Sequence, residues 1–397
     1  MIKQFDFDSV VDRRGSYCTQ WDFVADRFGE PDLLPFTISD MDFAVAPPIR
    51  AALQQRLDHG VFGYSRWQHA DFLSAVCDWM HTRFNSTVDP RALVYGPSVI
   101  YMVAQMMRRW TAPGDEVLIH TPAYDAFYGM LAHNQRRLLA QPLQHGPQGW
   151  FCDMQALEQL LARPGCKLML LCSPHNPTGK VWTRGELEQM AILCKRHKVR
   201  VISDEIHMDL VMAEDVVHMP WSQLADADHG WALFTSASKS FNIPALTGAW
   251  GIVFDPQDRQ ACLQYMKAAD GLSSPALFAV AAHIAAYRQG APWLDALRAY
   301  LRDNLLQVAR RLNAAFPQLN WQPPQATYLA WIDLNPLGID EAALQQQLIR
   351  QQKVAMMPGS TYGEASRGFL RLNAGCPRSK LDEGLTRLIA ALHALGV

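Results

Sequence analysis

The heptapeptide Ser236-Ala-Ser-Lys-Ser-Phe-Asn242 places Lys239 among small hydroxyl side chains, just after a short apolar run. Asp204 lies 35 residues earlier, at the end of the apolar stretch 199–203, and the turn Asn176-Pro-Thr-Gly179 comes before both. A lysine amine condenses with an aldehyde to form a Schiff base, so a lysine in this setting can anchor an aldehyde cofactor covalently. The order Asn, Asp, Lys therefore predicts an enzyme with such a cofactor.

The companions of the lysine match the needs of pyridoxal phosphate. Its pyridine nitrogen stays protonated only beside a carboxylate, which Asp204 supplies from the end of a predicted strand. Asn176 offers an amide and His207 a ring N–H to the ring oxygen. Ser236 and Ser238 are short hydroxyls that suit a phosphate. We therefore expect pyridoxal 5'-phosphate as cofactor, and we expect no metal.

Each of these residues alone has an ordinary explanation. Most lysines are solvated at the surface, Asn-Pro is a turn signal, and an aspartate often caps a helix. The stretch 236–239 also matches Ser-x-x-Lys, the signature of penicillin-binding enzymes, but the Ser-Asp-Asn and Lys-Thr-Gly motifs of those enzymes are absent. The joint order of the residues carries the prediction.

Composition agrees with a large enzyme that has no affinity for polyanions. A chain of 397 residues with 49% apolar content has room for about two domains. The 36 Lys and Arg balance 38 Asp and Glu, so no nucleic-acid or membrane partner is expected. No apolar run reaches about 18 residues, and the eight cysteines are scattered, as in a reducing compartment. We therefore expect a cytoplasmic enzyme.

Short apolar runs alternate with longer amphipathic ones, which is typical of a parallel sheet covered by helices. The strands are expected over 93–95, 116–120, 167–172, 199–203, 232–235 and 250–254. The helices are expected over 98–111, 122–133, 153–162, 183–197 and 257–289. Ligands in such sheets bind at the carboxyl ends of strands, where Asn176, Asp204 and Ser236 fall.

The last quarter of the chain predicts a second, smaller unit. A long helix begins after Gly290-Ala-Pro292 and runs to Phe316, and further strands are expected within 321–334 and 353–372. We predict an α/β fold with a large domain over 48–290, built on a mostly parallel seven-stranded sheet. Residues 1–47 and 291–397 are expected to form a smaller α/β domain.

Four segments of the chain resemble the fold type I pyridoxal phosphate enzymes of the aminotransferase I and II class. They are Ser173-Pro-His-Asn-Pro-Thr-Gly179, Ser203-Asp-Glu-Ile-His207, Ser236–Asn242 and Phe369-Leu-Arg-Leu-Asn-Ala-Gly375. Within this class the chain resembles the cystathionine β-lyase branch over essentially its whole length. The resemblance implies a fold type I transferase architecture and a homodimer.

The same resemblance implies a role for each site residue. Lys239 would form the Schiff base, Asp204 would pair with the pyridine nitrogen, and Asn176 would contact the ring oxygen. His207 stands where most of the class has tyrosine. Tyr124 would stack on the cofactor ring.

The phosphate is expected at the start of the helix near residue 98, because the first N–H groups of a helix are unpaired and favour anions. Its implied ligands are the backbone N–H groups of Ser98, Val99 and Ile100, the hydroxyls of Ser236 and Ser238, and Tyr64 of the neighbouring subunit. Tyr64 is also expected to contact the substrate.

Arg371 is expected to bind the substrate α-carboxylate through its planar fork, which lysine cannot reproduce. Its apolar neighbours predict a buried strand rather than a solvated surface position. Many class members carry a phosphate-binding arginine eight residues after the lysine, and this chain has Thr247 there. The departure favours elimination over amino transfer and leaves the phosphate to backbone amides and hydroxyls.

We expect a carbon–sulfur β-lyase that cleaves the thioether amino acid L-cystathionine to homocysteine, pyruvate and ammonia. A pyridoxal-phosphate-dependent aminotransferase is the alternative, because both reactions share every step up to the carbanion. The resemblance also implies a second role, repression of the transcription activator of the maltose regulon through protein contact. The chain carries no basic stripe or recognition helix, so direct binding to nucleic acid is not expected.

Overall fold

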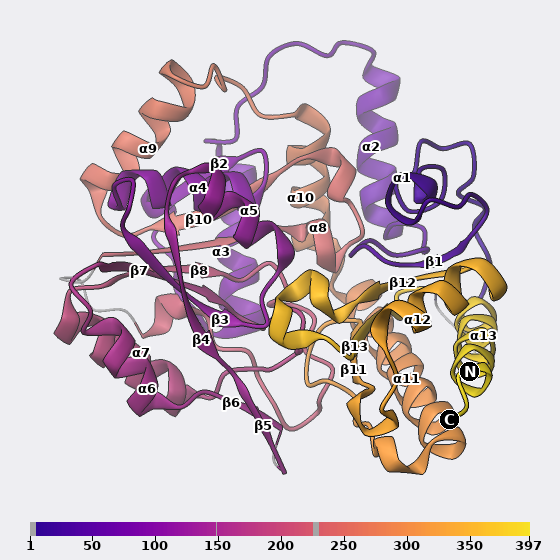
Figure 1. Ribbon diagram of the computed structural model, residues 1–397. Helices are drawn as coiled ribbons and strands as arrows, with labels where there is room; N and C mark the ends of the chain where they lie inside the picture. Colours follow the sequence, from indigo (N-terminus) through magenta and orange to yellow (C-terminus); the bar gives the residue numbers. More distant parts are fainter. Residues whose placement is uncertain (1–4, 148, 225–229) are drawn as a thin grey trace.

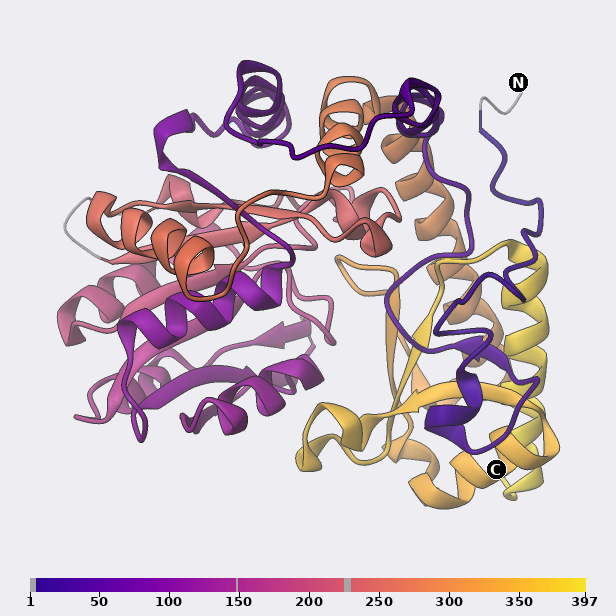
Figure 2. The same cartoon turned by 90° about the horizontal axis from the view of Figure 1, so that it is seen from above.

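The computed structural model describes residues 5–147, 149–224 and 230–397, which form two lobes, each built on its own sheet (Figures 1 and 2). The larger sheet has seven strands, in the order β2 (Leu93–Gly96), β10 (Ala249–Val253), β9 (Trp231–Thr235), β8 (Arg200–Asp204), β7 (Cys166–Cys172), β3 (Glu116–Thr121) and β4 (Arg137–Pro142). Strand β10 runs antiparallel to both neighbours, and the other neighbouring pairs are parallel. The predicted seven-stranded, mostly parallel sheet is confirmed.

Both faces of this sheet are covered, which explains why its strands are continuous apolar runs. Along β7, Leu168 and Leu170 join one buried cluster, whereas Met169 and Leu171 join the cluster on the opposite face. The first cluster takes in α4 (Val99–Trp110), α5 (Asp125–His133) and α9 (Pro256–Ala268). The second takes in α3 (Ala70–Phe84), α6 (Met154–Leu161), α7 (Arg184–His197) and α10 (Leu277–Gln289), and α10 packs on α2 (Pro47–His59).

Two details differ from the sequence prediction. Strand β4 has no counterpart among the six predicted strand segments, because it is an edge strand in which most residues are exposed. The helix expected over 257–289 is wrong as one element, since α9 ends at Ala268 and α10 begins at Leu277. Gly271, at a φ of 68°, and Pro275 lie in the break between them, where a helix cannot continue.

The smaller sheet joins the two ends of the chain. Its strands lie in the order β1 (Leu34–Phe36), β12 (Val354–Pro358), β13 (Phe369–Asn373) and β11 (Leu329–Asp333). Strand β1 pairs in parallel with β12, so the indigo N-terminal segment lies beside the yellow C-terminal elements in Figure 2. The helices of the smaller lobe are α1 (Val24–Phe28), α11 (Ala291–Ala315), α12 (Glu341–Gln346) and α13 (Arg378–Ala394). From these pairings we propose the same division, 48–290 against 1–47 with 291–397.

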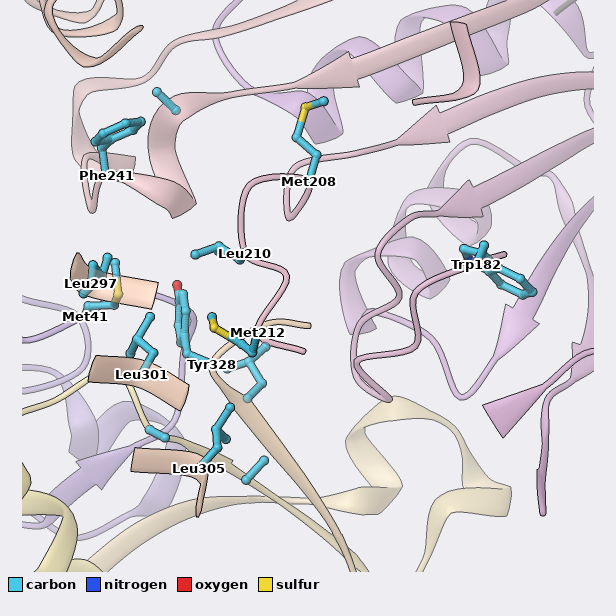
Figure 3. Close-up of a cluster of buried hydrophobic side chains, with 14 of the residues drawn as sticks. Met41, Trp182, Met208, Leu210, Met212, Phe241, Leu297, Leu301, Leu305 and Tyr328 are labelled. Carbon is cyan, nitrogen blue, oxygen red and sulfur yellow. The ribbon is translucent and has the colours of Figure 1, made fainter. Parts of the chain in front are cut away.

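A buried apolar cluster fastens the two lobes together (Figure 3). Tyr328, beside β11, lies among Leu301 of α11, Met212 from the larger lobe and Met41 from the N-terminal segment. Burial of each such side chain stabilises the fold by about 1.5–3 kcal/mol. The Tyr328 hydroxyl donates to the carbonyl oxygen of Ser39 at 2.9 Å, so this cluster also positions the loop that faces the site.

Two smaller features complete the description. A hairpin of β5 (Gln144–Gly146) and β6 (Gly149–Phe151) extends from the larger lobe (Figure 1). Within the three described ranges, none of the helices combines the length and the apolar character needed to cross a membrane.

Candidate active site

Three adjacent strand ends bring the predicted site residues together. Asp204 is the last residue of β8, Asn176 lies in the turn after β7, and Ser236 caps a short helix, α8 (Ala237–Ser240), directly after β9. Because β7, β8 and β9 are neighbouring parallel strands, their carboxyl ends open at one edge of the sheet.

An inner cavity of about 180 Å³ opens at this edge. Ten of the twelve predicted site residues line its wall, Arg371 is hydrogen-bonded to one of them, Asn176, and Tyr64 lies elsewhere. The predicted residues that line it are Ser98, Val99, Ile100, Tyr124, Asn176, Asp204, His207, Ser236, Ser238 and Lys239. The structure therefore assembles residues that are spread over some 140 positions of the chain.

Lys239 forms the wall that the inner cavity shares with a larger, outer cavity of about 490 Å³. Its Nζ donates to the carbonyl oxygen of Ser39 at 2.8 Å. Burial, together with the nearby Arg371, lowers the pKa of the amine to about 8, although Asp40 and Asp204 oppose the shift. An amine with such a pKa is a competent nucleophile and base near neutral pH.

Two buried groups that line the inner cavity, Asp204 and His207, lack the partners that would satisfy their polar atoms. Burial raises the pKa of Asp204 to about 7, with Glu205 adding to the rise, although the backbone N–H of Ile206 donates to this carboxyl at 3.2 Å. Burial lowers the pKa of His207 to about 3, and its Nδ1 has no hydrogen-bond partner among the described residues. Such groups are costly in a protein interior unless a ligand satisfies them.

The start of α4 also lines the inner cavity. The hydroxyl of Ser98 accepts from the backbone N–H of Tyr101 at 3.2 Å and caps the helix. The first N–H groups of a helix have no partner within it, so they attract an anion. Since Ser98, Val99 and Ile100 all line the cavity, a phosphate fits at this helix start.

The serines near the lysine are engaged in the local fold. The hydroxyl of Ser236 donates to the carbonyl oxygen of Gly248 at 2.6 Å and accepts from the backbone N–H of Ser238 at 3.0 Å. The single proton of Ser236 is therefore already used, and its role towards a phosphate stays a prediction. Thr247, at the position where the resemblance led us to expect a phosphate-binding arginine, lines a neighbouring cavity with Tyr95.

Arg371 lies in β13, on the smaller lobe, and reaches across to the site. It is 3% exposed, its Nη2 donates to the carbonyl oxygen of Thr37 at 2.7 Å, and its Nη1 donates to Oδ1 of Asn176 at 3.3 Å. The guanidinium carbon lies 4.6 Å from the ring centroid of Tyr362, and its Nε has no partner among the described residues. Arg371 and Tyr362 both line the outer cavity, where a carboxylate can meet the fork.

Tyr64 is the predicted residue that the structure keeps apart. It is 99% exposed and lines neither of the two cavities of its own chain. Its predicted contacts would have to form with a second subunit, and they stay a prediction.

Sequence reasoning missed three residues that shape the site. Ser39 accepts from Lys239, Tyr362 lies under Arg371, and Asn242 holds the Ser39 loop through hydrogen bonds to the backbone of Met41. Asn242 is the last residue of the heptapeptide Ser236–Asn242, so its closeness to Lys239 in the sequence could have indicated a role at the site. The loop around Ser39 has no periodic pattern, and only the tertiary fold brings it to the lysine.

The arrangement combines the groups that carbanion chemistry on an amino acid requires. A buried amine with a lowered pKa lies between a cavity that fits an aromatic phosphate and a cavity that presents an arginine fork. The amine can therefore act on a ligand held in either cavity.

Comparisons with known proteins agree with this chemistry. The family described as aminotransferase class I and II matches residues 31–388. Protein MalY of Escherichia coli (strain K12) is 63% identical over 391 residues, which cover 98% of this chain and 100% of MalY. Cystathionine beta-lyase PatB of Bacillus subtilis is 37% identical and covers 97% of this chain and 99% of its own length.

Solved structures give the same picture. Cystalysin from Treponema denticola, which contains pyridoxal 5'-phosphate, superposes with a TM-score of 0.91 at 28% identity, over 98% of this chain and 99% of cystalysin. The pyridoxal-phosphate-bound C–S lyase from Staphylococcus hominis superposes with a TM-score of 0.91 at 26% identity, over 98% of both chains.

Proposed function

We propose that this chain, which belongs to the aminotransferase class I and II family, converts L-cystathionine and water to homocysteine, pyruvate and ammonia. The enzyme class itself follows from the comparisons: the chain is a pyridoxal-phosphate-dependent carbon–sulfur β-lyase with the fold type I architecture. The predicted fold class, enzyme class and cofactor are confirmed at this level. The substrate and the roles of individual residues belong to the proposal.

The residues of the inner cavity fit the cofactor. The unpartnered Nδ1 of buried His207, the raised pKa of Asp204 and the helix start at α4 are three features that a phosphorylated pyridine ring would satisfy. Bound pyridoxal phosphate withdraws electrons from the α-carbon of an attached amino acid. Lys239 would hold it covalently, and Asn176 would contact its ring oxygen.

Around that group, the protein's own residues orient the substrate and move its protons. Arg371 holds the substrate α-carboxylate, because its Nε is free to turn to a ligand and its ring neighbour Tyr362 fixes the plane of the fork. Asp204 keeps a proton on the pyridine nitrogen, since a carboxylate beside a cation is favoured in its charged form. Lys239 takes the α-proton, which its lowered pKa permits near neutral pH.

One observation carries the proposal: Lys239 lies in the wall common to both cavities. The amine would therefore face the cofactor on one side and the substrate on the other. A residue that first holds the cofactor and then transfers the α-proton of the substrate must reach both. Tyr124 lines both cavities as well, and in this proposal its ring would cover the cofactor.

The decisive experiment separates the lyase from the aminotransferase, the other reaction that these residues support. The purified holoenzyme is incubated with L-cystathionine in the absence of any keto acid, and pyruvate and homocysteine are followed. A lyase releases both over many turnovers, whereas an aminotransferase releases neither and stops after converting one equivalent of substrate per site to the corresponding keto acid. Release of no pyruvate, or of no more than one equivalent per site, would contradict the proposal, and Lys239→Ala serves as the inactive control.

We also propose that the protein is a homodimer. Tyr64 and its neighbour Phe62 are exposed in the single chain, at 99% and 54%, which is unusual for large aromatic side chains unless another surface covers them. In the dimer, Tyr64 of the partner subunit would reach the phosphate and the substrate. Size-exclusion chromatography with light scattering tests the dimer directly.

Two further parts of the proposal concern the cell. A cytoplasmic location agrees with the state of the eight cysteines, all of which are free thiols. Contact with the transcription activator of the maltose regulon rests on the resemblance to MalY at 63% identity. Co-purification of the activator with Lys239→Ala as well as with the unaltered enzyme would separate this contact from catalysis, and its absence from both would contradict the contact.

A further inference from the structure

The outer cavity holds a charged pair that the reaction at Lys239 does not use. Six charged side chains line this cavity: Arg13, Arg27, Asp40, Asp125, Lys239 and Arg371. Arg13 is bound tightly to Asp40 at 2.6 Å, and Lys239 and Arg371 donate to backbone carbonyls at 2.8 and 2.7 Å. The remaining two, Arg27 and Asp125, pair only loosely with each other, and we call them the loose pair.

Nη2 of Arg27 lies 3.4 Å from Oδ2 of Asp125, and the two side chains are 47% and 34% exposed. Arg27 lies in α1 of the smaller lobe, and Asp125 is the first residue of α5 on the larger lobe. A long, solvated ion pair contributes little stability, so a ligand can separate its partners at small cost. The pair therefore offers one cation and one anion to whatever enters the cavity.

Tyr362 links this pair to the arginine that receives the reacting end of the substrate. Its ring lies against Arg371, and burial raises the pKa of its hydroxyl to about 12, while Arg371, Asp125 and Arg27 all act on that hydroxyl electrostatically. The loose pair and Arg371 are thus close to the same phenol. All of them line the outer cavity, so one ligand bound there can meet both Arg371 and the loose pair.

The proposed reaction gives this placement a use. L-cystathionine carries an amino acid zwitterion at each end, and Arg371 accounts for the carboxylate of only one. We propose that Arg27 binds the carboxylate and Asp125 the ammonium of the distal, leaving-group end. This inference rests on the proposed function and narrows it to thioether amino acids whose leaving group itself carries a zwitterion.

The test compares two substrates that share the reacting end. L-cystathionine has the distal zwitterion and β-chloro-L-alanine lacks it, yet both yield pyruvate after β-elimination. Pyruvate release is measured for the unaltered holoenzyme, for Arg27→Gln and for Asp125→Asn. Arg184→Gln is the matched control, because Arg184 forms a similar exposed pair with Glu188 at 3.3 Å and lines neither cavity.

We expect each site variant to lower kcat/KM for L-cystathionine by about 10- to 100-fold, mainly through KM, and to change kcat/KM for β-chloro-L-alanine by less than about threefold. Arg27→Lys keeps the charge without the planar fork. Its kcat/KM for L-cystathionine should therefore lie between that of the unaltered enzyme and that of Arg27→Gln. Arg184→Gln should leave both substrates unchanged. Circular dichroism of each variant checks that the fold is intact.

Two outcomes would overturn the inference. Equal losses on both substrates would show that the pair only holds the lobes together, and unchanged kinetics would show that it binds no part of the substrate. The proposed function fails differently: the unaltered enzyme would then release pyruvate from β-chloro-L-alanine but none from L-cystathionine.

Discussion

The guanidinium of Arg371 donates to the side-chain oxygen of Asn176 across the boundary between the two lobes, at 3.3 Å. Arg371 belongs to β13 of the smaller sheet, and Asn176 follows β7 of the larger one. The proposed carboxylate site and the proposed ring-oxygen contact are therefore coupled by a direct hydrogen bond. A change in either residue is expected to disturb both substrate and cofactor.

The first prediction concerns the shape of the arginine. Arg371→Lys keeps the positive charge but loses the planar fork and its contact with Tyr362. We expect kcat/KM for L-cystathionine to fall by about 100-fold, with KM rising, because a single ammonium cannot hold the carboxylate in one orientation. Steady-state pyruvate release measures the effect. Arg367→Lys, four residues away at an exposed ion pair, should leave KM unchanged, and a matching loss there would refute the prediction.

Most of the site could be predicted from the sequence because its residues follow strands that are buried on both faces. Such strands are uninterrupted apolar runs, so Asp204 stands out as a polar residue at the end of β8. The same logic fails for β4, because its apolar run is only three residues long, Leu138-Leu-Ala140, and most of the strand is exposed. It also fails for Ser39 and Tyr362, since tertiary contacts alone bring these residues to the lysine and the arginine.

The second prediction follows from the lowered pKa of Lys239. The amine must be deprotonated to attack an aldehyde, and burial lowers its pKa to about 8 from the ordinary 10.5. The rate at which the cofactor-free protein takes up pyridoxal phosphate should therefore rise with pH to a plateau, with a midpoint near 8. Stopped-flow absorbance at a series of pH values measures the midpoint. A midpoint near 10.5 would mean that the amine is solvated like an ordinary lysine.

The third prediction concerns the loop that faces the lysine. Asn242 accepts from the backbone N–H of Met41 at 2.9 Å and donates to the carbonyl oxygens of Met41 and Phe43, each at 2.8 Å. Asn242→Ala removes all three bonds, so we expect the free energy of unfolding to fall by about 2–4 kcal/mol. Urea denaturation of the cofactor-free protein measures this change.

The control for Asn242 is Asn85→Ala. Both asparagines have left-handed backbones, with φ of 56° and 50°, so the strain of placing alanine there is common to both variants. Asn85 is exposed at the end of α3, and its substitution should cost about 1 kcal/mol or less. Equal losses in the two variants would mean that the Asn242 hydrogen bonds contribute nothing measurable.

The last prediction uses the raised pKa of Asp204. In the cofactor-free protein this pKa is about 7, against an ordinary 3.8, so between these values the folded state binds more protons than the unfolded state. Stability must then fall as pH rises from about 4 to 7, by an amount on the order of a few kcal/mol. Asp204→Asn cannot ionise and should lose this part of the pH dependence. Burial lowers the pKa of His207, so the contribution of His207 to stability rises with pH. Because His207 is present in both proteins, its contribution cancels in their difference, which therefore isolates Asp204.

Thermal unfolding of the two cofactor-free proteins at pH 5 and pH 7.5 supplies the measurement. The unaltered protein should become less stable relative to Asp204→Asn as the pH rises through this window, since only its carboxyl must give up a proton in a buried position. With pyridoxal phosphate bound, the ring nitrogen pairs with the carboxylate, so the order should reverse and Asp204→Asn should be the less stable holoenzyme at pH 7.5. A pH-independent difference between the cofactor-free proteins would show that Asp204 is not destabilised by burial, and its proposed role at the pyridine nitrogen would lose its electrostatic basis.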